Sequence, residues 1–211
     1  MNKSQKLNTV TTLYVLLILT MFSLQTPVFA QENKKHDFIA LYTGDTLYGK
    51  VHYIDEGIPR KFYKKIRLTT SDGKRKKYNK KNVASFSVNN NTYESFWLSQ
   101  TSQIFKLVNP KYNIDHNYGE QYFLKVVNKG NLNHYELEWF EQGESLLWSM
   151  ALLKKEDDSF FIRADQGLIR LKRNVLLDYL SNCPRIIDAI NEKQIKNVRQ
   201  VVDFYNQNCM D

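Results

Sequence analysis

The chain has 211 residues, of which 42% are hydrophobic and 25% charged, and its formal net charge is +8. This composition is typical of a folded globular protein and excludes a disordered chain, a collagen-like repeat and a multi-pass membrane protein. The two cysteines are too few for a disulfide-dense scaffold or a four-cysteine zinc site.

The first 30 residues have the pattern of a secretory signal peptide. Two lysines precede an apolar run at residues 13–24, and small residues lead up to an expected cleavage site between Ala30 and Gln31. The apolar run is shorter than the roughly 20 residues of a membrane-spanning helix. We therefore expect an exported protein that is periplasmic, secreted or associated with the outer membrane, with residues 31–211 as its mature part.

Most of the mature part predicts strands, because β-branched and aromatic residues alternate with polar ones between short turns. The Asp-Gly pair at 72–73 is the strongest hairpin signal, and Gly49 within a strand predicts a bulge or sharp bend. The predicted strands are 37–42, 46–54, 64–70, 74–78, 82–88, 92–97, 104–108, 121–127, 132–140, 145–153 and 159–162.

The last 40 residues change to a helical period. Asn174 is a candidate cap for a short helix, and Pro184 occupies the favoured first position of a second helix. A third helix is predicted at 197–206. The fold class expected is α+β, mostly antiparallel β, with a small barrel-like part at 31–98, a β-meander at 99–172 and a helical C-terminal cap at 173–211.

Two resemblances to known proteins follow from these patterns. The order of strands and turns in residues 38–86 resembles a five-stranded small barrel of the SH3-like or Sm-like type. The segments 45–51 (DTLYGKV) and 177–184 (LDYLSNCP) resemble an uncharacterised family of exported proteins common in Bacteroidetes. The second resemblance implies an exported location and no activity, cofactor or functional residue.

The stretch 60–81 carries 11 basic residues and one acid, Asp72. Such a hairpin attracts polyanions in a salt-dependent way, and the interleaved Phe62, Tyr63 and Tyr78 suit stacking on sugars or bases. The expected partners are an anionic glycan, lipopolysaccharide or an anionic membrane surface rather than nucleic acid. The alternative is an edge hairpin that lysines keep soluble. The basic residues are Arg60, Lys61, Lys64, Lys65, Arg67, Lys74, Arg75, Lys76, Lys77, Lys80 and Lys81.

The remaining candidate sites are sparse. Cys183 and Cys209 suggest a disulfide outside the cytoplasm, with two free thiols or a redox pair as alternatives. His134, Glu136 and Glu138 alternate on one face of a strand, either as a solvated face or as the carboxylates of a glycan hydrolase. No metal-ligand spacing, phosphate loop or nucleophile motif is present, so no cofactor or metal is expected.

The strand aromatics add one more open question. They are either core residues or an exposed platform for sugars or a partner protein, and they are Phe96, Trp97, Trp139, Phe140 and Trp148. The sequence therefore favours a non-enzymatic binding or structural module of the bacterial envelope. The alternatives are a carboxylate-based glycan hydrolase and an adaptor that binds other envelope proteins.

Overall fold

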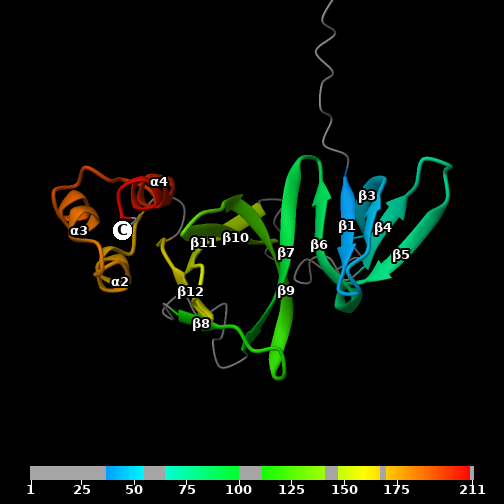
Figure 1. Ribbon diagram of the computed structural model, residues 1–211, viewed down its shortest axis with the longest axis horizontal. Helices are drawn as coiled ribbons and strands as arrows, with labels where there is room; N and C mark the ends of the chain where they lie inside the picture. Colours follow the sequence, from blue (N-terminus) through cyan, green and yellow to red (C-terminus); the bar gives the residue numbers. More distant parts are fainter. Residues whose placement is uncertain (1–36, 55–64, 100–110, 141–146, 167–169, 210–211) are drawn as a thin grey trace, which may run out of the picture. The chain divides into compact units, whose positions relative to one another are not determined.

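Antiparallel strands make up most of the described chain, as the alternation of apolar and polar residues predicts. The computed structural model describes residues 37–54, 65–99, 111–140, 147–166 and 170–209 (Figure 1). The strands are β1 Phe38–Leu41, β2 Thr46–Tyr48, β3 Lys50–Ile54, β4 Lys65–Thr69, β5 Arg75–Asn79, β6 Val83–Val88, β7 Asn91–Ser99, β8 Lys111–Asn113, β9 Gly119–Asn128, β10 Leu132–Phe140, β11 Leu147–Lys155 and β12 Phe160–Arg163. The helices are α2 Arg173–Tyr179, α3 Pro184–Asn191 and α4 Val198–Asn208.

This arrangement confirms the predicted α+β class with a helical C-terminus. The strand predicted at 104–108 lies outside the described residues, and β8 was not predicted. No helix in the described part of the chain is long and apolar enough to cross a membrane.

The strands of the described residues form one sheet of nine and one of three. The large sheet has the order β2-β1-β6-β7-β9-β10-β11-β12-β8, and the small sheet has the order β3-β4-β5. All pairings are antiparallel. The large sheet curls, so that β8 at its edge returns to β7, where the Asp115 amide donates to the Trp97 carbonyl at 2.7 Å.

Gly49 separates β2 in the large sheet from β3 in the small one, which is the predicted bend. A Cβ atom at Gly49 would lie 2.4 Å from the backbone oxygen of Thr69. Only glycine therefore allows the chain to pass this close to β4 as it moves from one sheet to the other. The two sheets share a hydrophobic core that includes Ile39, Ile66 and Phe86, all fully buried.

Strands β10, β11 and β12 are covered on both faces. On one face Tyr135 and Leu137 belong to a core enclosed by the curled sheet. On the other face Leu132 and Leu153 pack against the helices α2, α3 and α4, which Figure 1 shows beside these strands. The helices therefore close a second core over the outer side of the sheet.

Helix α3 starts where the sequence predicts, and α4 starts at Val198, one residue after its predicted start. Pro184 is the first residue of α3, and the Asn197 side chain caps α4 by accepting from the Gln200 amide at 3.0 Å. The prediction that Asn174 caps the first helix was wrong, because α2 begins at Arg173. The Lys172 amide donates to the Ala164 carbonyl at 2.8 Å, so backbone pairing continues up to the residue before the helix.

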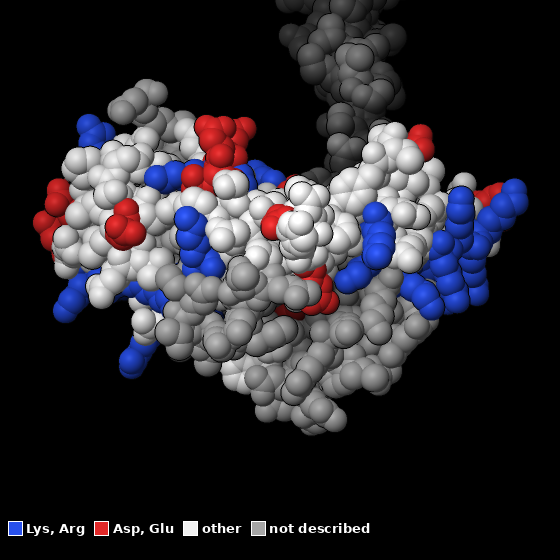
Figure 2. All heavy atoms as spheres, turned by 90° about the horizontal axis from the view of Figure 1, so that it is seen from below, with Lys and Arg blue, Asp and Glu red and all other residues white. Residues whose placement is uncertain are grey.

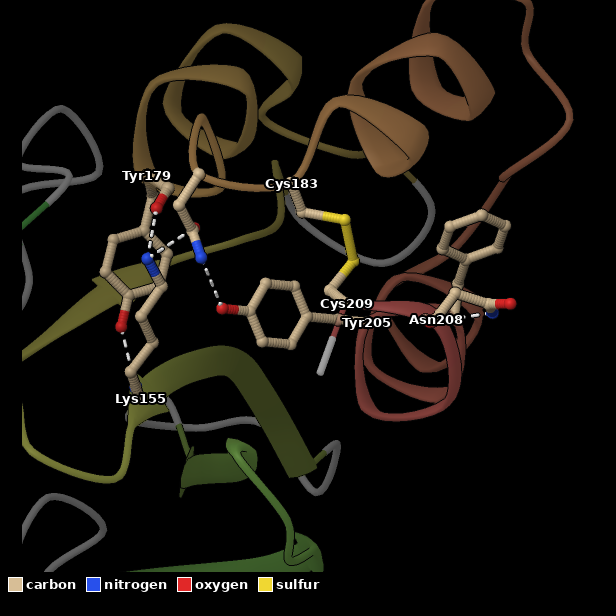
Figure 3. Close-up of a disulfide and its surroundings, with 8 residues drawn as sticks. Lys155, Tyr179, Cys183, Tyr205, Asn208 and Cys209 are labelled. Carbon is tan, nitrogen blue, oxygen red and sulfur yellow. Dashed lines mark hydrogen bonds between the residues drawn. A yellow bond between two sulfur atoms is a disulfide. The ribbon is translucent and has the colours of Figure 1, made fainter. Parts of the chain in front are cut away.

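A disulfide between Cys183 and Cys209 joins the start of α3 to the end of α4, with 5.6 Å between the Cα atoms. Figure 3 shows the ring of Tyr205 beside this disulfide and Lys155 of β11 extending toward Tyr179. The Lys155 ammonium donates to the Tyr179 carbonyl and to the Asn182 side chain, both at 2.9 Å. These bonds attach the helices to the C-terminal end of β11.

Candidate functional site

The register of the small sheet places basic side chains in rows across its exposed face. His52 of β3, Arg67 of β4 and Lys77 of β5 are directly opposite one another in successive strands. Lys50 and Arg75 lie at the two ends of the next row, with Thr69 between them. We call the exposed side of this sheet the basic face. It consists of Lys50, His52, Lys65, Arg67, Arg75 and Lys77.

The opposite side of the same sheet is apolar. Val51, Ile66, Leu68 and Tyr78 are buried in the core beneath it. Because side chains alternate between the two sides of a strand, this burial determines which residues point outward. Burial of the hydrophobic side thus fixes which side chains make up the basic side.

Little negative charge balances the basic face. Asp72 in the β4–β5 turn forms an ion pair with Lys74, 2.8 Å between the charged atoms. In the described part of the chain, none of the ion pairs includes Arg67, Arg75 or Lys77. Figure 2 shows Lys and Arg side chains side by side at the end of the molecule formed by this sheet.

The structure divides the predicted basic stretch into distinct groups. Lys65, Arg67, Arg75 and Lys77 share the basic face, whereas Lys74 and Lys81 are exposed beside it. Arg60, Lys61 and Lys64 lie outside the described residues.

Two of the predicted contact residues point elsewhere. Lys76 is exposed but lies on the side of β5 opposite to the basic face, with its ammonium 5.2 Å from the centre of the Tyr78 ring. Lys80 is half-buried and donates to the backbone carbonyl of Gln121 at 3.2 Å.

Two members of the basic face were missed by the sequence analysis. Lys50 and His52 precede the basic stretch by several residues and join it only through the pairing of β3 with β4. The expectation that Tyr78 stacks on a ligand was wrong, because its side chain is only 8% exposed. Phe62 and Tyr63 lie outside the described residues.

A second feature is a pocket of about 330 Å³ between β10, β11 and the start of α4. Its polar lining comes from both sheet strands, the chain after β12 and the residues around the N-terminal end of α4. The polar side chains are His134, Glu136, Ser149, Asp165, Arg170, Lys196 and Asn197, and the apolar ones are Ala151, Leu171 and Val198.

His134 lines this pocket, although the sequence placed it on a solvated face. The residue is 5% exposed, and neither ring nitrogen has a hydrogen-bond partner in the described structure. Burial, reinforced by the charge of Arg199, lowers the pKa of His134 to about 4, and Asp203 opposes this only in part. The imidazole is therefore neutral at physiological pH.

The two carboxylates predicted beside His134 have different surroundings. Glu138 accepts from the Lys125 ammonium and from the Tyr93 hydroxyl, both at 3.1 Å. Glu136 lines the pocket and lies 3.6 Å from the same ammonium. Burial lowers the pKa of Lys125, but its contacts with these carboxylates outweigh burial and raise the pKa above its usual value.

The other carboxylate of the pocket belongs to Asp165. Its Oδ1 atom accepts from Arg163 Nε at 3.0 Å, and the Arg163 side chain is 3% exposed. Burial raises the pKa of Asp165, although Arg163 acts in the opposite direction. No group of three or more histidine, cysteine or acidic side chains in the described residues is placed to hold a metal ion.

The strand aromatics divide between packing against the core and half-buried positions. Phe96 packs edge-on against Tyr135 and Phe161, with ring centres 5.2 Å and 4.9 Å apart. Trp97, Trp139 and Trp148 are half-buried, and the Phe140 side chain lies outside the described residues.

No protein-family model, curated protein or solved structure matches the chain.

Proposed function

We propose that this protein is an exported, non-enzymatic binding module of the bacterial envelope whose basic face contacts a polyanion. The observation that carries the proposal is the row of His52, Arg67 and Lys77 across three strands. Arg67 and Lys77 in this row are like charges placed directly opposite one another, and such a pair opposes folding. A polyanion bound to this surface neutralises the row and removes the repulsion between its charges.

The position of Arg67 supports binding over simple protection of a sheet edge. Lysines on an edge strand prevent sheets from joining, and this accounts for Arg75 and Lys77 on β5. Arg67 and Lys65 are on β4, which is the central strand of the small sheet. A charge on a central strand does nothing to protect the edge, whereas it widens the charged surface available to phosphates, sulfates or carboxylates.

The spacing of the rows fits a repeating anion. Directly opposite residues in neighbouring strands have Cβ atoms about 5 Å apart, and successive residues on one face of a strand are about 7 Å apart. Several charges of one polymer or lipid headgroup layer can therefore meet several cations at once. We favour lipopolysaccharide phosphates or an acidic glycan as the polyanion, because an exported protein meets these first.

The test is binding of the purified protein to lipopolysaccharide, anionic vesicles, an acidic polysaccharide and DNA at increasing salt. The variant Arg67→Gln/Lys77→Gln removes two charges from the basic face, and Arg185→Gln/Lys193→Gln removes two exposed charges near α3 as a matched control. We expect the first variant to bind one polymer about tenfold or more weakly and to show a smaller salt dependence.

The control variant should bind like the unmodified protein. Equal weakening by both variants would show that only the total charge matters. Unchanged binding by the Arg67→Gln/Lys77→Gln variant would overturn the proposal, and so would weak and equal binding of all four polymers.

A further inference from the structure

We propose that the pocket beneath α4 binds a small carboxylate that also carries hydroxyl groups, of the sugar-acid class. This site goes beyond the proposed polyanion surface and uses none of its residues. Its volume of about 330 Å³ is at the small end of the range of ligand pockets, about 300–1,000 Å³. A single sugar ring is therefore a suitable size of ligand.

The hydroxyl specificity follows from His134. A buried polar group without a hydrogen bond is costly, and the imidazole here leaves both nitrogens unpaired. A neutral imidazole has one donor and one acceptor. A ligand hydroxyl suits either nitrogen because it both donates and accepts. Glu136, two residues along the same face of β10, and Ser149, which is opposite Glu138 farther along the lining, suit further hydroxyls.

The carboxylate specificity follows from how the charges of the pocket are balanced. Asp165 is paired with Arg163, and Glu136 lies 3.6 Å from Lys125, whose single charge it shares with Glu138. The cations of the lining, Arg170 and Lys196, form no ion pair with the described acids. The unbalanced charge in the pocket is therefore positive.

The N-terminal end of α4 adds to the positive charge of the pocket. Asn197 and Val198 line the pocket, and α4 begins at Val198. The Asn197 side chain accepts a hydrogen bond from the Gln200 amide, and the Asn197 carbonyl accepts one from the Val201 amide. The first-turn amides that precede Gln200 have no partner within the helix. They favour an anion beside Lys196.

The test compares three probes by calorimetric titration of the purified protein. Glucuronate carries both ring hydroxyls and a carboxylate, glucose lacks the carboxylate, and acetate lacks the hydroxyls. We expect glucuronate to bind at least about tenfold more tightly than glucose or acetate, because each probe that lacks a group leaves a part of the lining unpaired. Acetate binding as tightly as glucuronate would overturn the hydroxyl assignment, and absence of glucuronate binding would overturn the site.

Variants and spectroscopy locate the binding. Lys196→Gln, at an exposed position, should weaken glucuronate binding about tenfold, whereas the matched control Arg185→Gln should leave it unchanged. Glucuronate should also shift the imidazole resonances of His134, assigned with His134→Gln. Binding without a shift at His134, or equal loss in both lysine and arginine variants, would place the ligand elsewhere and contradict the proposal.

The Arg67→Gln/Lys77→Gln variant separates this site from the basic face. It should bind glucuronate as the unmodified protein does, even where it no longer binds the polyanion. A parallel loss of both ligands would show a single anion surface and overturn the separate pocket.

Discussion

Arg67 and Lys77 lie directly opposite one another on β4 and β5, and neither forms an ion pair in the described part of the chain. Such a pair of like charges opposes folding by a few tenths of a kcal/mol, whereas opposite charges at the same positions stabilise a sheet by a similar amount. The basic face therefore combines a cost in stability with a gain in charge density.

This relationship predicts opposite effects of one substitution on stability and binding. Lys77→Glu should raise the free energy of unfolding by roughly 0.2–1 kcal/mol because the carboxylate faces Arg67, and it should weaken polyanion binding. Urea denaturation and the binding assay measure the two quantities. A variant that is both less stable and equally able to bind would contradict the assigned role of the row.

The side chain of Asn206 in α4 forms the hydrogen bonds to the Leu132 backbone of β10 that a neighbouring strand would otherwise form. It accepts from the Leu132 amide at 2.8 Å and donates to the Leu132 carbonyl at 3.0 Å. Leu132 is fully buried. Asn206→Ala should therefore lower the free energy of unfolding by about 2 kcal/mol, because two buried backbone groups lose their partners.

Gly130 provides an internal check on this contact. A Cβ atom at Gly130 would lie 2.5 Å from Asn206 Nδ2, and the bonds to Leu132 prevent the amide from moving aside. Gly130→Ala should destabilise the protein, but much less so when Asn206→Ala has removed the obstacle. Denaturation of the two single variants and the double variant measures this coupling, and strictly additive effects would argue against the clash.

The disulfide predicts a dependence of the helices on redox conditions. It closes a segment of 26 residues between Cys183 and Cys209, and such a loop contributes about 3.5 kcal/mol in the chain-entropy model. Reduction should lower the free energy of unfolding by this amount, measured by urea denaturation with and without a thiol reductant. The Cys183→Ala/Cys209→Ala variant should be less stable from the start and insensitive to the reductant.

The buried His134 predicts a loss of stability in mild acid. The folded protein keeps the ring neutral down to a pKa of about 4, whereas the unfolded chain takes up the proton near pH 6.5. Between these values unfolding binds a proton, so stability falls as the pH falls, by about 3 kcal/mol in total. Arg199 and Asp203 act on the ring, and Glu136 and Asp165 line the same pocket.

The measurement is urea denaturation of the protein and of His134→Gln at pH 7 and pH 4.5. Other acids titrate in both proteins, so the difference between the two curves isolates His134. The variant should lose less stability than the unmodified protein on acidification. Equal losses would show that the ring is already accessible to protons in the folded state.

Local patterns in the sequence determined the elements. The bounds predicted for β10, residues 132–140, are those observed, and the bend at Gly49 and the start of α3 at Pro184 are where the pattern placed them. These features depend on alternation, on a missing Cβ and on a ring that fixes the backbone, all of which act within a few residues.

Only the tertiary structure decided which strands are neighbours and which of their faces are buried. Lys50 and His52 join Arg67 because β3 pairs with β4, and no local rule states which strands become neighbours or in which register. His134 alternates like a solvated residue, yet α4 packs over its strand and buries it. Which face of a strand is buried depends on the sheets and helices packed against it. Both the basic face and the pocket therefore form only when distant segments of the chain meet.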